Sequence, residues 1–122
     1  MATNLRILSA GTLTDTQGSP TASLGPTAAS AKSWLIKSLV VTNMGTASKV
    51  LNIKASRLGG TSVQVAPKDM AIPAGASINF GVDVTLMAPA TGSADSLNLV
   101  ATTPGSPGID YVAYGVESDV TL

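Results

Sequence analysis

The sequence predicts an all-β protein, a single antiparallel β-sandwich of the jelly-roll or Greek-key type with an extended N-terminal arm. Two observations lead to this fold class: short apolar segments alternating with polar residues recur along the chain, and turns rich in Pro and Gly separate them. No window has the 3.6-residue periodicity and caps of a helix. At 122 residues the chain fits one domain with one core.

The middle of the chain contains the clearest strands. Residues 34–43 form a β-branched and Leu-rich run, and residues 43–46 supply the turn before a second strand at 49–58. In that second strand Leu51, Ile53 and Ala55 share one face, which indicates a half-buried antiparallel hairpin.

The segment IPAGASINFGVDV, from residue 72 to 84, predicts a turn followed by a strand with one core face. Its alternating apolar positions are Ile78, Phe80, Val82 and Val84. A short alternating segment at 62–66 precedes it, and strands at 96–102 and 109–118 follow it. The last two are separated by TPGSPG, which bars a helix there.

The N-terminal third has a different composition. Residues 5–10 could form a short strand, whereas 11–33 consist mostly of Thr, Ser, Ala, Gly and Pro. We therefore divide the chain into an N-terminal strand and assembly arm at 1–33 and a β-sandwich domain at 34–122. The arm is expected to become ordered against a neighbouring molecule, with a flexible linker as the alternative. Deletion of residues 1–30 should then leave a folded domain.

Charge and composition limit the possible partners. Charged residues make up 11% of the chain, against roughly 25% in an ordinary soluble domain. The seven basic residues are scattered and are balanced by seven acidic ones, so we expect no nucleic-acid binding. No apolar run approaches the roughly 20 residues that cross a membrane, and no secretory signal is expected. A surface of such low charge suits permanent contact with other protein.

Residues for catalysis are scarce, and we expect no enzymatic activity. The chain contains no His and no Cys, which removes serine and cysteine triads and thiolate metal sites. Glu117 and Asp119 share a strand face and could serve a glycosidase or bind a cation. A solvated strand end is the commoner explanation for such a pair. No catalytic residue, metal or cofactor is therefore assigned.

Three segments resemble a pattern found in small virion proteins of tailed bacteriophages. The pattern has an "I-x-S-hydrophobic" strand ending in Asn, an "IPAG-S" strand, a "GDsL" element and a closing strand that ends in Gly-x-Glu. The matching segments, 35–43, 72–102 and 109–118, span about two-thirds of the chain. The "GDsL" element appears as Gly92 to Leu97, two residues longer than usual, and the closing element as Gly115-Val116-Glu117.

The resemblance implies a β-sandwich that attaches to a phage particle. We expect a cement protein that decorates and stabilises the capsid exterior, binding the major capsid protein as a homo-oligomer of three copies. It would be made in the cytoplasm of the bacterial host and located on the virion. A tail, neck or fibre component, including a receptor-binding tip, is the alternative.

Candidate assembly contacts are the apolar residues that the predicted sandwich accounts for least. Trp34 has a second explanation as the first residue of a core strand. Tyr111 and Tyr114 are three residues apart on a strand, so they should point to opposite faces and form no sugar platform. The candidate contacts are Leu5, Ile7, Leu8, Leu24, Pro26 and Trp34.

Overall fold

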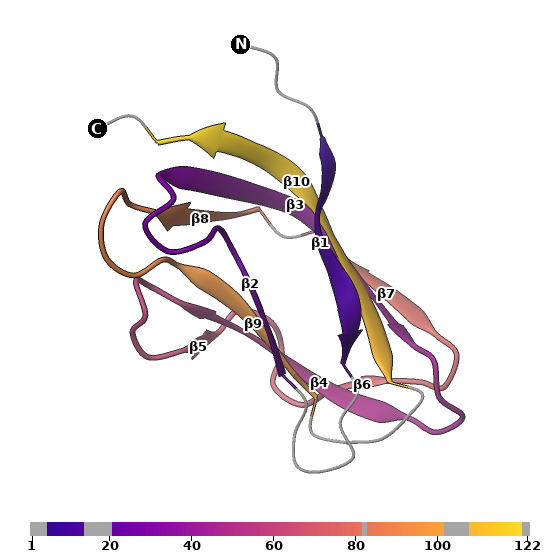
Figure 1. Ribbon diagram of the computed structural model, residues 1–122. Helices are drawn as coiled ribbons and strands as arrows, with labels where there is room; N and C mark the ends of the chain where they lie inside the picture. The colour runs from indigo at the N-terminus through magenta and orange to yellow at the C-terminus, as the bar shows by residue number, and fades with distance from the viewer. Residues whose placement is uncertain (1–4, 14–20, 82, 102–107, 121–122) are drawn as a thin grey trace.

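The chain folds into two antiparallel sheets packed face to face (Figure 1). The computed structural model describes residues 5–13, 21–81, 83–101 and 108–120, and none of these residues is helical. The prediction of an all-β antiparallel sandwich is therefore confirmed.

Sheet A contains the two longest strands at its centre. Its spatial order is β1 (Arg6–Leu13), β10 (Ile109–Asp119), β3 (Lys32–Asn43) and then β7 (Ser77–Phe80) and β8 (Val84–Ala88). The last two strands pair with successive parts of β3 and together form one edge.

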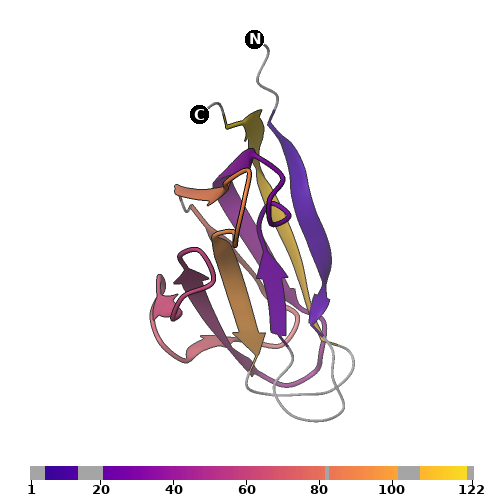
Figure 2. The same cartoon turned by 60° about the vertical axis from the view of Figure 1, so that its left-hand side comes forward.

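Sheet B is smaller and has one interrupted edge as well. Its spatial order is β2 (Thr21–Leu24), β9 (Ser96–Ala101), β4 (Lys49–Ser56) and then β5 (Val63–Gln64) and β6 (Met70–Ile72), both paired with β4. Figure 2 shows β2 beside β9, while β1 lies at the edge of the other sheet.

The connectivity is that of a jelly roll. If β5 with β6 and β7 with β8 are each taken as one interrupted strand, the described residues form eight strands. The first then pairs with the last, the second with the seventh, the third with the sixth and the fourth with the fifth. This nested pairing is one long antiparallel hairpin rolled into a sandwich, and it is one of the two topologies that the sequence predicts.

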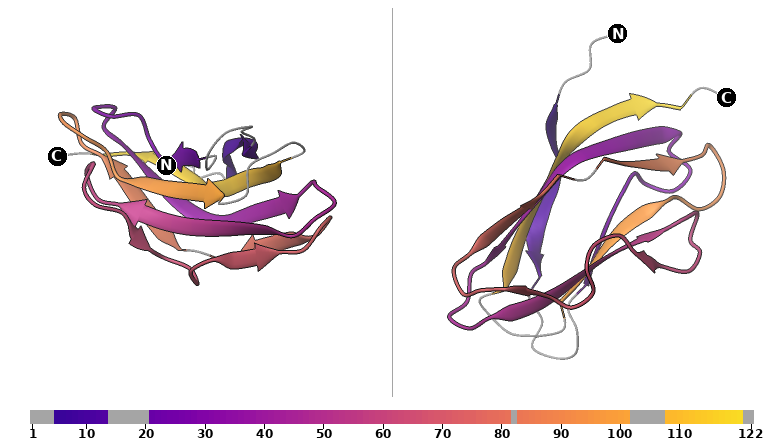
Figure 3. Two further views of the ribbon diagram at one scale, coloured as in Figure 1. Left: turned by 90° about the horizontal axis from the view of Figure 1, so that it is seen from below. Right: turned by 180° about the vertical axis from the view of Figure 1, so that it is seen from behind.

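The core lies between the sheets and consists of aliphatic side chains from alternate strand positions. In β3 these positions are Leu39 and Val41, and in β9 they are Leu97 and Leu99, all fully buried. The two layers are visible from below and from behind in Figure 3. Because inward and outward residues alternate, each sheet also presents an outer face away from the core.

Two neighbouring strand pairs of sheet A, β1 with β10 and β10 with β3, each contain a register shift. The register shifts between Ile7 and Ser9 on β1 and again where β10 passes from Tyr114 to Gly115 opposite β3. A Cβ added at Gly115 would overlap the carbonyl oxygen of Leu35 and lie 2.8 Å from Cδ1 of Leu8. Glycine therefore permits the close approach of backbones at this bulge.

The predicted strand through residues 78–84 is interrupted in the structure. β7 ends at Phe80 and β8 begins at Val84, although both pair with the same side of β3. Phe80 pairs with Leu39 and Val84 with Ile36, so the edge has one more residue between these pairs than β3 has. Val82 lies outside the described residues. Such a bulge bends an edge strand and ends its pairing locally.

The N-terminal third differs from the arm that composition suggested. β1 pairs with β10 along its length, and β2 pairs with β9 from Thr21 to Leu24. Both therefore belong to the sandwich, whose first described strand begins at Arg6 and not at Trp34. The Ser- and Thr-rich segment becomes a strand because β9 supplies backbone partners and the core accepts the Leu24 side chain. Residues 14–20 of the predicted arm lie outside the described residues.

Candidate functional site

The two carboxylates that could have formed an acid–base pair are both engaged in ion pairs. Glu117 accepts a hydrogen bond from Arg6 Nη2 at 3.0 Å on Oε1 and one from Trp34 Nε1 at 2.8 Å on Oε2. Asp119 pairs with Lys32 on the neighbouring strand. The hydrogen bond and the charge of Asp119 raise the pKa of the Lys32 ammonium. This arrangement ties the ends of β1, β3 and β10 together.

The Asn43 side chain links the first two segments of the phage-like pattern. It is fully buried, and its Nδ2 donates to the carbonyl of Ala47 at 2.8 Å and to that of Ile72 at 2.9 Å. Its Oδ1 accepts from the backbone N–H of Gly45 at 2.9 Å. The backbone of Asn43 also bonds Gly75 and Ala76, so it is bonded to the IPAG turn by both side chain and backbone.

The remaining pattern residues have structural contacts as well. Asp95 accepts hydrogen bonds from the backbone N–H groups of Leu58 at 2.9 Å and Met87 at 3.1 Å, which joins the end of β4 to β8. Gly115 allows β10 to approach β3, and Glu117 holds Arg6 and Trp34. In this chain these residues of the pattern therefore position turns and strands.

The candidate assembly contacts fall into two groups. Leu5 and Ile7 are 66% and 57% exposed at the start of edge strand β1. Leu8 and Trp34 are half-buried and pack against the core. Leu24 is 1% exposed and Pro26 is buried, so both side chains are part of the sandwich. They were selected as apolar residues outside the predicted sandwich, and that reason does not hold in the structure.

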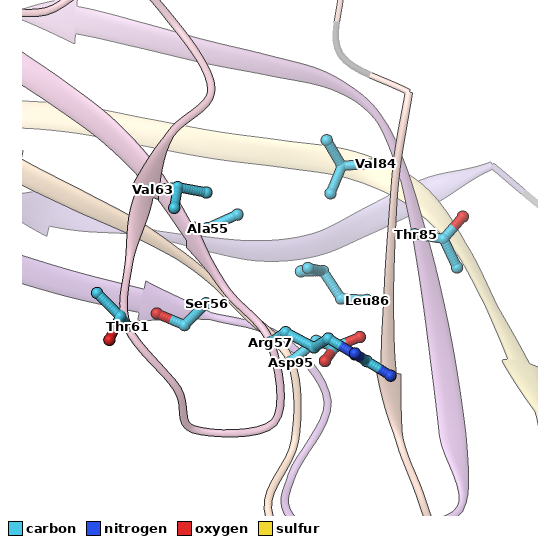
Figure 4. A pocket seen from close by; sticks show the side chains of 9 residues that line it. All are labelled: Ala55, Ser56, Arg57, Thr61, Val63, Val84, Thr85, Leu86 and Asp95. Carbon is cyan, nitrogen blue, oxygen red and sulfur yellow. The ribbon is translucent and has the colours of Figure 1, made fainter.

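A small cavity opens on the side of the sandwich between the two sheets (Figure 4). It has a volume of about 310 Å³, and Ala55, Val63, Val84 and Leu86 form its apolar part. Arg57 and Asp95 lie together at one margin, and both Asp95 carboxylate oxygens are already occupied by backbone donors. The cavity cannot be recognised in the sequence, because most of its walls come from β4, β5 and β8, which only the folded topology brings together.

The outer faces of the two sheets differ in chemistry. Directly paired residues share a face, so Val112 lies beside Val40, Tyr114 beside Ile7 and Val116 beside Leu35, all opposite the core. We call these six residues the apolar face: Ile7, Leu35, Val40, Val112, Tyr114 and Val116. The placement of Tyr111 against the core and Tyr114 on this outer side confirms that the tyrosines point apart.

The outer face of sheet B is polar instead. Asn52, Lys54 and Ser56 of β4 alternate with the core residues Leu51 and Ile53. On β9 the outward positions are Ser96, Asn98 and Val100, with the Asn98 Nδ2 donating to Ser56 Oγ at 3.0 Å. The sequence itself indicates this difference between the two outer faces. In sheet A, the strand segments SLVV and YVAY contain apolar residues at successive positions, whereas in sheet B the segments NIKAS and SLNL alternate between polar and apolar residues.

The sequence matches no protein-family model, no curated protein and no solved structure. No described segment forms a helix long and apolar enough to cross a membrane. Among the described residues, acidic side chains do not gather in groups of three that could hold a metal ion. The apolar face and the exposed start of β1 are therefore the candidate functional site, as an interaction surface.

Proposed function

We propose that this chain is a structural protein of a phage virion that decorates and stabilises the capsid exterior as a homo-oligomer. The observation that carries the proposal is the apolar face, which lies on the outside of a sandwich whose other face is polar. A surface of this kind marks a protein–protein contact more often than a catalytic cleft.

Three further features support an assembly role. Charged residues form only 11% of the chain, and the basic and acidic residues balance. Electrostatic repulsion between molecules is therefore weak, which favours stable contact with other protein. The jelly roll is a common fold of viral capsid and lectin domains, although a fold alone does not fix a function. The resemblance of three segments to phage virion proteins supplies the specific assignment.

In this proposal the partner is the major capsid protein, and binding raises the stability of the assembled shell. A protein that binds the assembled shell and not its free subunits shifts the equilibrium toward the shell. No chemical step is needed, in keeping with carboxylates that are already paired with Arg6 and Lys32. The chain acts by contact area alone.

Co-sedimentation with purified phage particles tests the assignment. The purified chain is titrated onto heads that lack it and, separately, onto isolated tails, and the bound amount is measured at saturation. We expect hundreds of copies per head and a higher melting temperature of the decorated heads. Binding only to tails at a few copies, or to neither particle, would overturn the capsid assignment.

A further inference from the structure

The apolar face runs along the two longest strands of the protein, β3 and β10. In β10, Tyr111 and Ala113 face the core while Val112 and Tyr114 lie on the other side. In β3, Val40 lies between the buried Leu39 and Val41. Strands that are apolar on both sides are typical of sheets covered on both sides, and only one side of sheet A is covered by sheet B.

We propose that the apolar face of sheet A packs against the same face of a second copy of this chain, which gives a two-fold dimer of four stacked sheets. The inference rests on the proposed function, because it specifies the contact through which the oligomer forms. Contact between identical faces is the arrangement of a two-fold dimer, in which one patch is complementary to itself. Sheets pack this way in sandwiches, with aligned strands about 30° apart.

The whole outer side of sheet A, which contains the apolar face together with polar positions, is large enough for a dimer contact. Four strands spaced about 4.8 Å apart, with central strands of about 11 residues rising about 3.3 Å each, cover about 700 Å². A standard protein–protein interface buries about 800 Å² on each partner. Ile7 and Met87, which are 57% and 39% exposed, extend the apolar area to opposite edges of the sheet.

Several polar side chains on the same side of sheet A already have partners, so covering these leaves less hydrogen-bonding capacity unmet. Ser38 Oγ donates to Asn79 Oδ1 at 2.7 Å, and Thr12 Oγ1 donates to Asp110 Oδ1 at 2.6 Å. The hydroxyls of Thr42 and Ser77 are hydrogen-bonded at 2.6 Å. An unpartnered polar group would cost about 1–3 kcal/mol on burial, and these pairs avoid much of that cost.

The charge on this side favours a second copy over an anionic partner. Its basic residue Lys37 forms an ion pair with Asp83 at 2.8 Å, and Asp110 lies toward the other end of the sheet. A nucleic acid or an anionic lipid surface would need a basic stripe, which the face does not have. An apolar and nearly neutral face is complementary to another copy of itself.

Light scattering coupled to size-exclusion chromatography tests the pairing on the full chain. From low micromolar to several hundred micromolar protein, the mass should rise from one chain to two. A single-chain mass throughout this range would overturn the proposal. A mass of three chains, the number expected from the resemblance, would overturn it too, because identical faces close at two.

A matched pair of variants assigns the contact to the apolar face. Val112→Lys places a charge in the face, whereas Val100→Lys places the same charge on the polar outer face of sheet B, at a half-buried strand position as well. We expect Val112→Lys to weaken dimerisation at least tenfold and Val100→Lys to leave it unchanged. Equal dimerisation of both variants, with thermal melts showing both folded, would contradict the assignment.

The pairing and the capsid assignment can fail separately. A chain that dimerises through the apolar face but binds no particle supports the pairing and removes the capsid role. A chain that saturates heads while remaining a monomer in solution supports the capsid role and removes the pairing. If Val112→Lys reaches the particle at wild-type stoichiometry without dimerising, the dimer contact is independent of the capsid contact.

Discussion

Asn43 connects two turns through a side chain that has no contact with water. Its amide donates to Ala47 and Ile72 and accepts from Gly45, so each polar atom of the amide is used in a buried site. A hydrogen bond contributes about 1 kcal/mol, but removal of one partner leaves buried groups without a replacement for water. Individual residues of this kind fix how the strands connect.

Asn43→Ala should lower the free energy of unfolding by about 2–4 kcal/mol, because the Gly45 N–H and the Ala47 carbonyl lose their bonds to this side chain and the Ile72 carbonyl keeps only the longer bond from Ser48 Oγ at 3.4 Å. Urea denaturation measures the loss. Asn79→Ala is the control, since Asn79 is exposed and its described partner is Ser38 alone; it should cost less than about 1 kcal/mol. Equal losses in the two variants would mean that Asn43 has no special structural role.

Gly115 is required by the close approach of β3 and β10 at the bulge. Gly115→Ala should destabilise the fold by at least about 2 kcal/mol, because the added methyl meets the Leu35 carbonyl and Leu8. Gly81→Ala should cost less than about 1 kcal/mol, because nothing lies within 4 Å of its Cβ position. Thermal denaturation of both variants measures the difference, and a tolerated Gly115→Ala would contradict the geometry of this bulge.

Because of the Lys32–Asp119 pair, the free energy of unfolding should depend on pH in the alkaline range. Asp119 raises the pKa of Lys32 in the folded state, so the contribution of the pair is complete below the unfolded value of 10.5 and is lost as pH rises through the folded value. The stability difference between the wild type and Lys32→Gln should stay constant from neutral pH to about 9 and then shrink above 10.5. A stability difference between the wild type and Lys32→Gln that grows at alkaline pH would contradict this prediction.

At the scale of elements, the sequence predicted strands where alternation was strong. The strands β3, β4, β9 and β10 follow directly from patterns such as the alternating Leu51 and Ile53. The predicted antiparallel hairpin of β3 with β4 is wrong, because β3 lies in sheet A and β4 in sheet B, so the turn at 43–46 carries the chain from one sheet to the other. β2 was missed because its four residues contain one large apolar side chain, Leu24, and its formation depends on pairing with β9. The break at 81–83 was missed because a bulge depends on the opposite strand and not on local alternation.

The candidate surface was predictable only in part. Leu5 and Ile7 were identified from their position outside the main strand pattern, and they are exposed. The apolar face as a whole was not, because the side on which Val40 and Val112 lie is fixed by strand register. Register depends on turns and bulges distant in the sequence, which composition and periodicity do not reveal.

Removal of the N-terminal strands tests whether they are part of the fold. A chain that begins at residue 25 lacks β1 and β2, the edge strands that pair with β10 and β9. We expect it to lose the cooperative thermal transition of the full chain, since the Leu13 and Leu24 side chains leave the core. A truncated chain that melts cooperatively would support a sandwich that begins near residue 34.

At the scale of the whole molecule, the protein is a sandwich in which the apolar face occupies part of the outer side of sheet A and the outer side of sheet B is mostly polar. The core lies between the inner faces of both sheets, and the apolar face lies on the side of sheet A that sheet B does not cover. In the proposed dimer, the stability of the single chain and the association of two chains therefore depend on different side chains. Substitutions on the apolar face should change association more than the unfolding of the dilute monomer.

Thiol labelling most directly tests the claim that this face is covered in the working protein. The chain has no cysteine, so each variant introduces a single thiol. Val112→Cys places it on the apolar face, and Val100→Cys places it on the outer face of sheet B. The labelling rate with a maleimide is measured in dilute solution, at high concentration and on saturated heads. We predict that the Val112→Cys variant becomes protected in the last two conditions while Val100→Cys stays reactive. Equal reactivity of the two thiols in all three conditions would contradict the account.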